Sequence, residues 1–117
     1  MTTILHLICA EDYHALAKDE PLRPASLASE GFIHCTAEPE VLLQVANSFY
    51  RELPGDYLVL VIDPAKVTAP VKYEAPAPPV GPLAQHLFPH IYGPLNRDAI
   101  IAVRPARRAA DGTFLAV

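Results

Sequence analysis

Proline is the residue that most constrains the fold of this chain, because thirteen prolines are spread over 117 residues. Each proline fixes φ and removes a backbone donor, so the chain is divided into short elements with stiff loops between them. Hydrophobic residues make up 51% and charged residues 19%, which is typical of a globular protein. A chain of this length can bury one core, and we expect residues 1–117 to form a single domain.

Hydrophobic patterning predicts an α+β fold, in which two helices pack on a mostly antiparallel sheet. Apolar and β-branched runs predict strands at 3–8, 31–35, 57–63, 71–75, 99–105 and 113–117. Helices are predicted over 10–19, where acids come early and Lys18 late, and over 39–53, where Pro39 precedes an apolar stripe. Prolines leave 20–30 and 76–96 as loops, and Asp111-Gly112 predicts a hairpin between the last two strands.

Charge and hydropathy exclude several classes of protein. The net charge of −4 argues against a general nucleic-acid binder, and no apolar run approaches the roughly 18 residues of a membrane span. The first residues lack the basic region of a signal peptide, so we expect a cytoplasmic protein. A late group of Arg97, Arg104, Arg107 and Arg108 is either a solvated hairpin face or a site for an anion, and nothing indicates an oligomeric state.

Histidines at strand ends and in the proline-rich loop predict a shared pocket. His6 lies inside an apolar strand, on the same face as Ile4 and Ile8 by alternation. His34 ends the next strand, His90 belongs to the long loop, and Glu74 is the acid of the fourth strand. Each of these alone is most simply explained as a structural or surface residue, and their joint occurrence favours a site.

Two other chemistries fit the same residues less well. A metal site would use imidazoles and a carboxylate, but Pro89 interrupts any helix through His86 and His90. His34 and Cys35 point to opposite faces of a strand, so they do not share an ion easily. The same alternation turns Cys35 toward the core when His34 faces a pocket, and buried thiols are usually inert. We therefore assign no metal ligands.

The segments EGFIHCT at 30–36 and FPHIYGPLN at 88–96 resemble those of the domain-of-unknown-function 952 (DUF952) family of small bacterial and plant proteins. LHLI near the start, the Tyr73-Glu74 pair and the closing Asp111-Gly112 turn extend the resemblance over nearly the whole chain. The family brings no known activity.

A second resemblance is to the NAD-cleaving transferases of the ADP-ribosyltransferase fold, especially the tRNA 2′-phosphotransferase branch. Their first strand carries His-Gly-Thr, and a later strand is similar to Ile33-His34-Cys35-Thr36. The resemblance implies a split sheet, a ribose contact from His6 and a late acid, for which Glu74 is the candidate. The chain departs from the pattern at Leu7-Ile8, which replaces small residues that let a ligand approach the backbone.

These patterns and resemblances together predict a single α+β domain with a mostly antiparallel, split sheet and two helices. The pocket is expected to be lined by His6, Ser26, His34, Thr36, Glu74, His90 and Tyr92. Its expected partner is a small nucleotide-like or NAD-derived ligand, with NAD as the candidate cofactor and His6, His34 and Glu74 as catalytic residues in a transferase-like reaction. The segment 76–96 is expected to cover this pocket. A non-catalytic binding module and a metal-dependent enzyme remain as alternatives.

Overall fold

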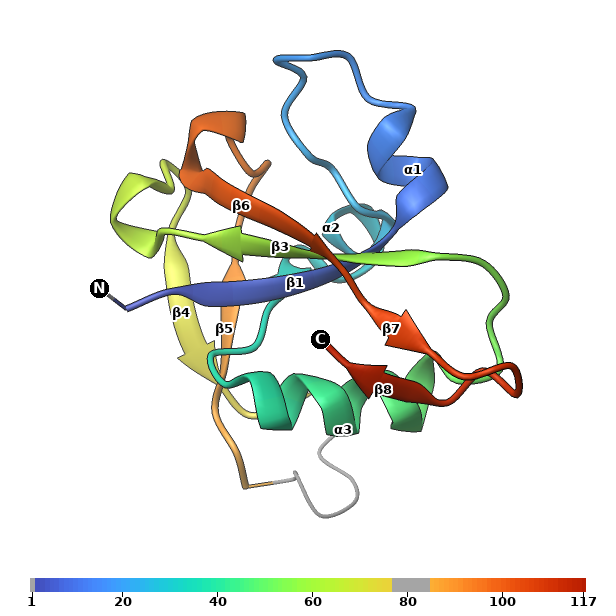
Figure 1. The fold of residues 1–117 in the computed structure, drawn as a ribbon. Coiled ribbons are helices and arrows are strands. Elements are labelled where there is room, and N and C mark those ends of the chain that lie inside the picture. Colours follow the sequence, from blue (N-terminus) through green and yellow to red (C-terminus); the bar gives the residue numbers. More distant parts are fainter. Residues whose placement is uncertain (1, 77–84) are drawn as a thin grey trace.

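A computed structural model describes residues 2–76 and 85–117 of the chain (Figure 1). The described strands form three antiparallel sheets, with the orders β1-β3-β6, β2-β5-β4 and β7-β8. Their bounds are β1 Ile4–Cys9, β2 Ile33–His34, β3 Tyr57–Ile62, β4 Val71–Glu74, β5 Phe88–Ile91, β6 Ile100–Pro105, β7 Arg107–Arg108 and β8 Phe114–Ala116. The α-helices are α1 Ala10–His14, α2 Ala25–Glu30 and α3 Pro39–Phe49, and short 3₁₀ turns span Pro64–Lys66 and Arg97–Ala99. None of the described helices combines the length and the apolar character needed to cross a bilayer. The predicted α+β class is confirmed.

The first sheet has β3 at its centre and apolar residues on both faces. In β1, Ile4 and Ile8 belong to one buried cluster, while Leu5 and Leu7 belong to another. This division follows from the two-residue alternation of a strand, and it turns the His6 side chain toward the Ile4 and Ile8 face as predicted. The sheet is therefore covered on both sides, and an imidazole enters one of the two cores.

Among the described residues, backbone pairing joins the second sheet to the first at a single residue pair. Leu5 of β1 and Thr36, two residues beyond β2, exchange both backbone hydrogen bonds, at 2.7 and 2.8 Å. Because pairing between these two segments goes no further, β1 and β2 diverge on either side of that bridge. The sheets are thus split at the point where His6 and His34 lie.

The helix α3 covers the second face of the first sheet. Its buried residues Leu42 and Ala46 pack in the same cluster as Leu5, Leu7 and Phe114. Figure 1 shows α3 lying beneath β1, with the β7-β8 pair alongside it. Val45 and Phe49, at neighbouring positions of the same predicted apolar stripe, line a pocket.

Two helix predictions need correction. The segment 20–30 was predicted to be a loop, but Ala25–Glu30 forms α2. Pro24 precedes its first turn with an extended backbone, a place where proline disturbs no helical hydrogen bond, and Gly31 ends it in the left-handed region. The predicted helix over 10–19 is shorter, since α1 ends at His14. The described part of the chain therefore has three short α-helices, not two.

The predicted loop over 76–96 contains a strand, β5, at the centre of the second sheet. Pro89 lies inside it, although proline is normally confined to sheet edges. The carbonyl of Pro89 accepts from Cys35 N at 3.0 Å, just beyond the end of β2 at His34. The missing N–H thus falls where the partner strand has already ended. Residues 77–84 of the predicted loop lie outside the described residues.

The predicted C-terminal hairpin has a different first strand. β6 pairs with β3, from Leu58 opposite Pro105 to Ile62 opposite Ile100, and lies at the edge of the first sheet without pairing with β8. β8 pairs instead with the two-residue strand β7, and the turn between them contains Asp111-Gly112 as predicted. Arg108 fixes this turn on the end of α3, donating to the carbonyls of Tyr50, Arg51 and Gly112.

Gly112→Ala should destabilise the protein more than Gly55→Ala. Both glycines have positive φ, +95° and +99°, which costs any other residue about 1–2 kcal/mol. A Cβ at Gly112 would also lie 2.3 Å from the backbone oxygen of Arg51, whereas a Cβ at Gly55 meets nothing within 4 Å. We expect Gly112→Ala to cost at least about 1 kcal/mol more than its control in urea unfolding. Equal losses would show that the hairpin does not rest rigidly on α3.

Candidate functional site

His6 and His34 meet across the split between the two sheets. Nδ1–H of His6 donates to the backbone carbonyl of His34 at 2.7 Å, although 28 positions separate the two residues. Burial lowers the pKa of His6, so the ring is neutral at neutral pH and Nε2 carries a lone pair. Because the acceptor is a backbone group, the tautomer of His6 is fixed by the fold itself.

Glu30 pairs with the His34 side chain at the end of the helix that precedes β2. Nε2 of His34 donates to Oε2 of Glu30 at 2.9 Å, and both side chains are partly exposed, at 42% and 38%. The two residues are four apart but do not lie on one helix, since Gly31 ends α2 with φ +89° and sends the chain into β2. The sharp turn at Gly31 thus folds the carboxylate back over the imidazole.

His90 is held from behind by Glu74 and Tyr92. Nδ1–H of His90 donates to Oε1 of Glu74 at 2.9 Å, and the Tyr92 hydroxyl donates to the same oxygen. The hydrogen bond from Tyr92, which has the larger effect, and the hydrogen bond from His90 both lower the pKa of Glu74 below its ordinary value. The bond to Glu74 in turn raises the pKa of Tyr92. Since an ionised carboxylate only accepts, His90 carries its proton on Nδ1. Its side chain is 2% exposed, and its Nε2 has no hydrogen-bond partner within residues 2–76 and 85–117.

The histidines of the second sheet share one face with aromatic residues. His34 lies directly opposite His90 in the β2-β5 register, and their rings are 5.5 Å apart. Phe32 stacks on His90 with ring centroids 4.1 Å apart and a 20° interplanar angle, and it also lies 5.4 Å from Tyr92. This packing holds the His90 ring at one angle, while Ile33 and Ile91 on the alternate positions enter the core.

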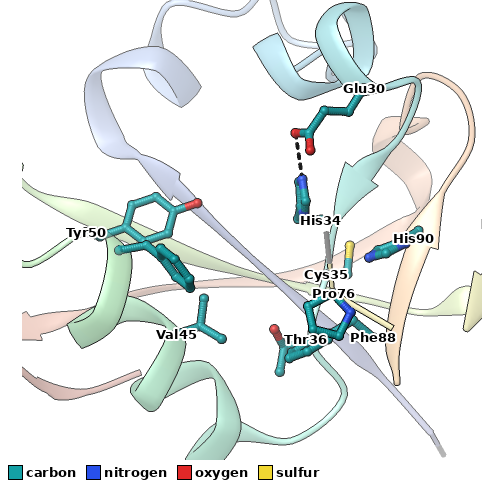
Figure 2. A pocket seen from close by; sticks show the side chains of 10 residues that line it. Glu30, His34, Cys35, Thr36, Val45, Tyr50, Pro76, Phe88 and His90 are labelled. Atoms are coloured by element: carbon teal, nitrogen blue, oxygen red, sulfur yellow. Dashed lines mark hydrogen bonds and ion pairs between the residues drawn. The ribbon is translucent and has the colours of Figure 1, made fainter. Parts of the chain in front are cut away.

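A pocket of about 300 Å³, pocket A, lies between this histidine face and α3 (Figure 2). Its polar walls are Glu30, His34, Cys35, Thr36 and His90, and its apolar walls are Val45, Phe49, Tyr50, Pro76 and Phe88. Figure 2 shows Tyr50 and Val45 on one side, with His34, Cys35 and His90 on the other. Aromatic walls with a few convergent polar groups are the usual make-up of a small-molecule site.

A second pocket of about 370 Å³, pocket B, adjoins pocket A. His34 and Tyr50 line both pockets, so the two pockets share part of their walls, and we refer to them together as the cleft. Pocket B also takes in His6 from β1, and the exposed Arg23 and the partly buried Ser26 from the α2 region. It is the more polar part, with a cation that pocket A does not have among its described lining residues.

The predicted site residues divide into those that line the cleft and those that stand behind it. His34 lines both pockets, Thr36 and His90 line pocket A, and His6 and Ser26 line pocket B. Ser26 also donates to the carbonyl of Phe32 at 2.9 Å, which ties α2 to the approach to β2. Glu74 and Tyr92 line neither pocket, because their polar groups are turned to each other and to His90.

The lining residues that the sequence did not predict include the polar residues Glu30, Tyr50, Arg23 and Asp12. Glu30 stands within the quoted segment EGFIHCT, and its spacing of four from His34 was a usable signal. Tyr50 follows the last apolar position of the α3 stripe and carries a raised pKa because of burial and the nearby Glu30 charge. Arg23 lies between two prolines in the segment predicted as a loop, and no local pattern marks it as a pocket residue.

The two alternative chemistries find little support in the described residues. Burial raises the pKa of the Cys35 thiol well above its usual range, which disfavours the thiolate that nucleophilic catalysis needs. Within residues 2–76 and 85–117, no group of three or more His, Cys, Asp or Glu residues is arranged to hold a metal ion.

The late arginines do not form one site. Arg97 donates to the carbonyls of Ala17 and Glu20 and to the Tyr13 hydroxyl, so it fastens the segment after α1. Arg108 stacks on Phe114 with its guanidinium carbon 4.3 Å from the ring centroid. These two side chains have structural partners at separate places in the fold.

Comparison with known proteins places the chain in a family without an assigned role. The model of the family described as "Protein of unknown function (DUF952)" matches residues 8–103. The crystal structure of protein CC0527 from Caulobacter crescentus, a structural genomics target, superposes with a TM-score of 0.77 at 23% identity, covering 97% of this chain and 94% of that one. A double mutant of the same protein gives the same values. No curated protein matches the chain. The solved structures thus support the fold alone.

Glu74→Gln should destabilise the folded protein at about pH 7 and much less at about pH 3. Gln keeps an acceptor oxygen for Tyr92 and His90, so the difference in unfolding free energy between the wild-type protein and the variant reports the contribution of the carboxylate charge. Because the folded-state pKa of Glu74 is lowered from 4.5, its contribution is complete above that value and is lost as the pH falls through the folded-state pKa. Urea unfolding of both proteins at the two pH values measures the change. A destabilisation of equal size at both would contradict the predicted charge linkage.

Proposed function

The chain belongs to the DUF952 family of proteins of unknown function, and we propose that it binds a nucleotide-like, NAD-derived ligand in the cleft formed by pockets A and B. The chemistry we propose there is transfer of an ADP-ribosyl group, as the resemblance of Ile33-His34-Cys35-Thr36 to NAD-cleaving transferases implies. The family assignment and the fold leave this activity open, and the case for it rests on the cleft.

The observation that carries the proposal is the contrast between two pockets that share His34 and Tyr50. Pocket A, with Phe49, Tyr50 and Phe88 among its walls, suits a flat aromatic ring. Pocket B is lined by one acid, Asp12, and one exposed cation, Arg23, and the Arg23 side of the pocket offers a partner to an anionic group. A nucleotide joins a flat ring to phosphate through a sugar. The cleft has the same order, with the apolar pocket A at one end, the shared residues His34 and Tyr50 in the middle, and Arg23 of pocket B at the other end.

His6 is suited to hold the sugar where the two pockets adjoin. Its Nδ1–H is already used by the His34 carbonyl, and its lowered pKa, caused mainly by burial, keeps the ring neutral. Nε2 can then accept a hydrogen bond from a sugar hydroxyl. This is the ribose contact that the resemblance implies for His6, and the geometry supports it with a fixed tautomer.

Glu30 is better placed than Glu74 to assist the transfer step, because Glu30 lines pocket A and Glu74 stands behind His90. In that step the bond between the sugar C1′ and the ring nitrogen breaks, and nicotinamide leaves with the bonding electrons as a neutral molecule. The positive charge passes to the sugar, where an acceptor oxygen forms the new bond and releases its proton to solvent. A carboxylate beside the sugar stabilises that charge.

His34→Ala should weaken NAD binding at least about tenfold, since His34 borders both pockets. The substitution keeps the backbone carbonyl that holds His6. His14→Ala is the matched control, because His14 is an exposed histidine of α1 that lines neither pocket. Isothermal titration with NAD and with ADP-ribose measures both effects. Failure of both compounds to bind the wild-type protein would refute the proposed function.

Glu30→Gln should leave NAD affinity within about threefold and slow nicotinamide release about 100-fold. Gln can still accept from His34, so the cleft keeps its shape while the charge is lost. Glu40→Gln, an exposed position in the first turn of α3, controls for the general loss of one negative charge. Chromatography of the products after incubation with NAD gives the rates. Unchanged release by the Glu30 variant would remove this carboxylate from the mechanism.

A further inference from the structure

His90 presents an unusual atom beside pocket A. Its ring is 2% exposed and lines the pocket, and Nε2 is shielded from bulk water with no partner in the described part of the chain. A buried polar atom without a hydrogen bond is costly, and each such atom in a native protein calls for an explanation. Here Nδ1–H is committed to Glu74, so Nε2 is an acceptor before any ligand arrives.

The protein maintains this state with several contacts. Tyr92 donates to the carboxylate that holds Nδ1–H, and Phe32 stacks on the ring at 4.1 Å. A tilt of the ring out of its plane would break the stacking on Phe32, and a 180° flip would break the bond to Glu74. The Nε2 lone pair is therefore fixed in direction on a ring that lines pocket A, and a donor N–H or O–H would complement it.

We infer that pocket A selects the carboxamide of a nicotinamide ring, with the amide N–H donating to Nε2 of His90. This inference rests on the proposed NAD-derived ligand and specifies which end of it enters pocket A. Thr36, another buried residue of that pocket, has a hydroxyl that can donate to the carboxamide oxygen. A pocket of about 300 Å³ accommodates a single substituted six-membered ring.

The same arrangement rejects a carboxylate. A nicotinic acid ring carries no donor for Nε2, and its negative charge would meet the lone pair of His90 and the carboxylate of Glu30 in one pocket. Sites built around a hydrogen bond discriminate strongly against analogues that lack the matching group. Pocket A should therefore distinguish NAD from its deamidated form, which differs from it only at this group.

The test compares NAD, deamido-NAD and ADP-ribose by isothermal titration at about pH 8 with the full chain. We expect NAD to bind at least about tenfold more tightly than deamido-NAD, and His90→Gln to bring the two within about threefold, since Gln offers both a donor and an acceptor. The affinity for ADP-ribose, which has no nicotinamide ring, should not change in His90→Gln. Equal wild-type affinities for NAD and deamido-NAD would overturn the inference and leave the proposed function standing.

Two further measurements keep the outcomes separate. Nitrogen-15 NMR of the free wild-type protein should show His90 as the Nδ1–H tautomer, and an Nε2–H tautomer would overturn the inference without any variant. Absence of both NAD and ADP-ribose binding would refute the proposed function, and the pocket would then be tested with nicotinamide and nicotinate alone. A preference for nicotinamide in chemical-shift titrations would uphold the inference, and equal or absent binding of the two would end it.

Discussion

The backbone pairing of Leu5 with Thr36 is the contact on which the rest of the site depends. Two hydrogen bonds, at 2.7 and 2.8 Å, join the sheets at this point, and the His6 side chain adds a third to the His34 carbonyl at 2.7 Å. The two sheets share a core, since Ile4 of β1 and Ile91 of β5 belong to one buried cluster. Residues of the same junction, Thr36 and His34, line pocket A. A longer pairing of β1 with β2 would remove the space that His34 now borders on two sides.

Local patterns predicted the parts of the site that depend on a single strand. Alternation placed His6 on the Ile4 and Ile8 face correctly, because side chains in a strand repeat every two residues whatever its partners are. The pairing of His34 with His90 could not be read in that way, since it depends on the register of two strands 56 positions apart, and β5 was hidden by Pro89. The proline was tolerated because β2 ends just where the missing N–H would be needed.

The positions of Glu74 and Glu30 could not be predicted from sequence spacing. Glu74 was assigned to the reacting centre by analogy, yet the β4-β5 register, with Lys72 opposite His90, sets its carboxylate behind the imidazole. Glu30 was within a segment already singled out, yet its contact with His34 requires the left-handed turn at Gly31. Sequence spacing predicts contacts within a regular element, and both of these contacts arise where elements meet.

The three histidines of the cleft differ in what holds each ring, and this determines what the cleft can bind. His6 donates to a backbone carbonyl, while His34 and His90 donate to carboxylates from α2 and β4. Each donor is thereby satisfied within the protein, and the remaining nitrogens of His6 and His90 are acceptors. Arg23 is the described cation at the edge of the cleft. A ligand complementary to these groups would offer donors to the two acceptor nitrogens and negative charge to Arg23, and the nicotinamide nucleotide that we propose has this distribution.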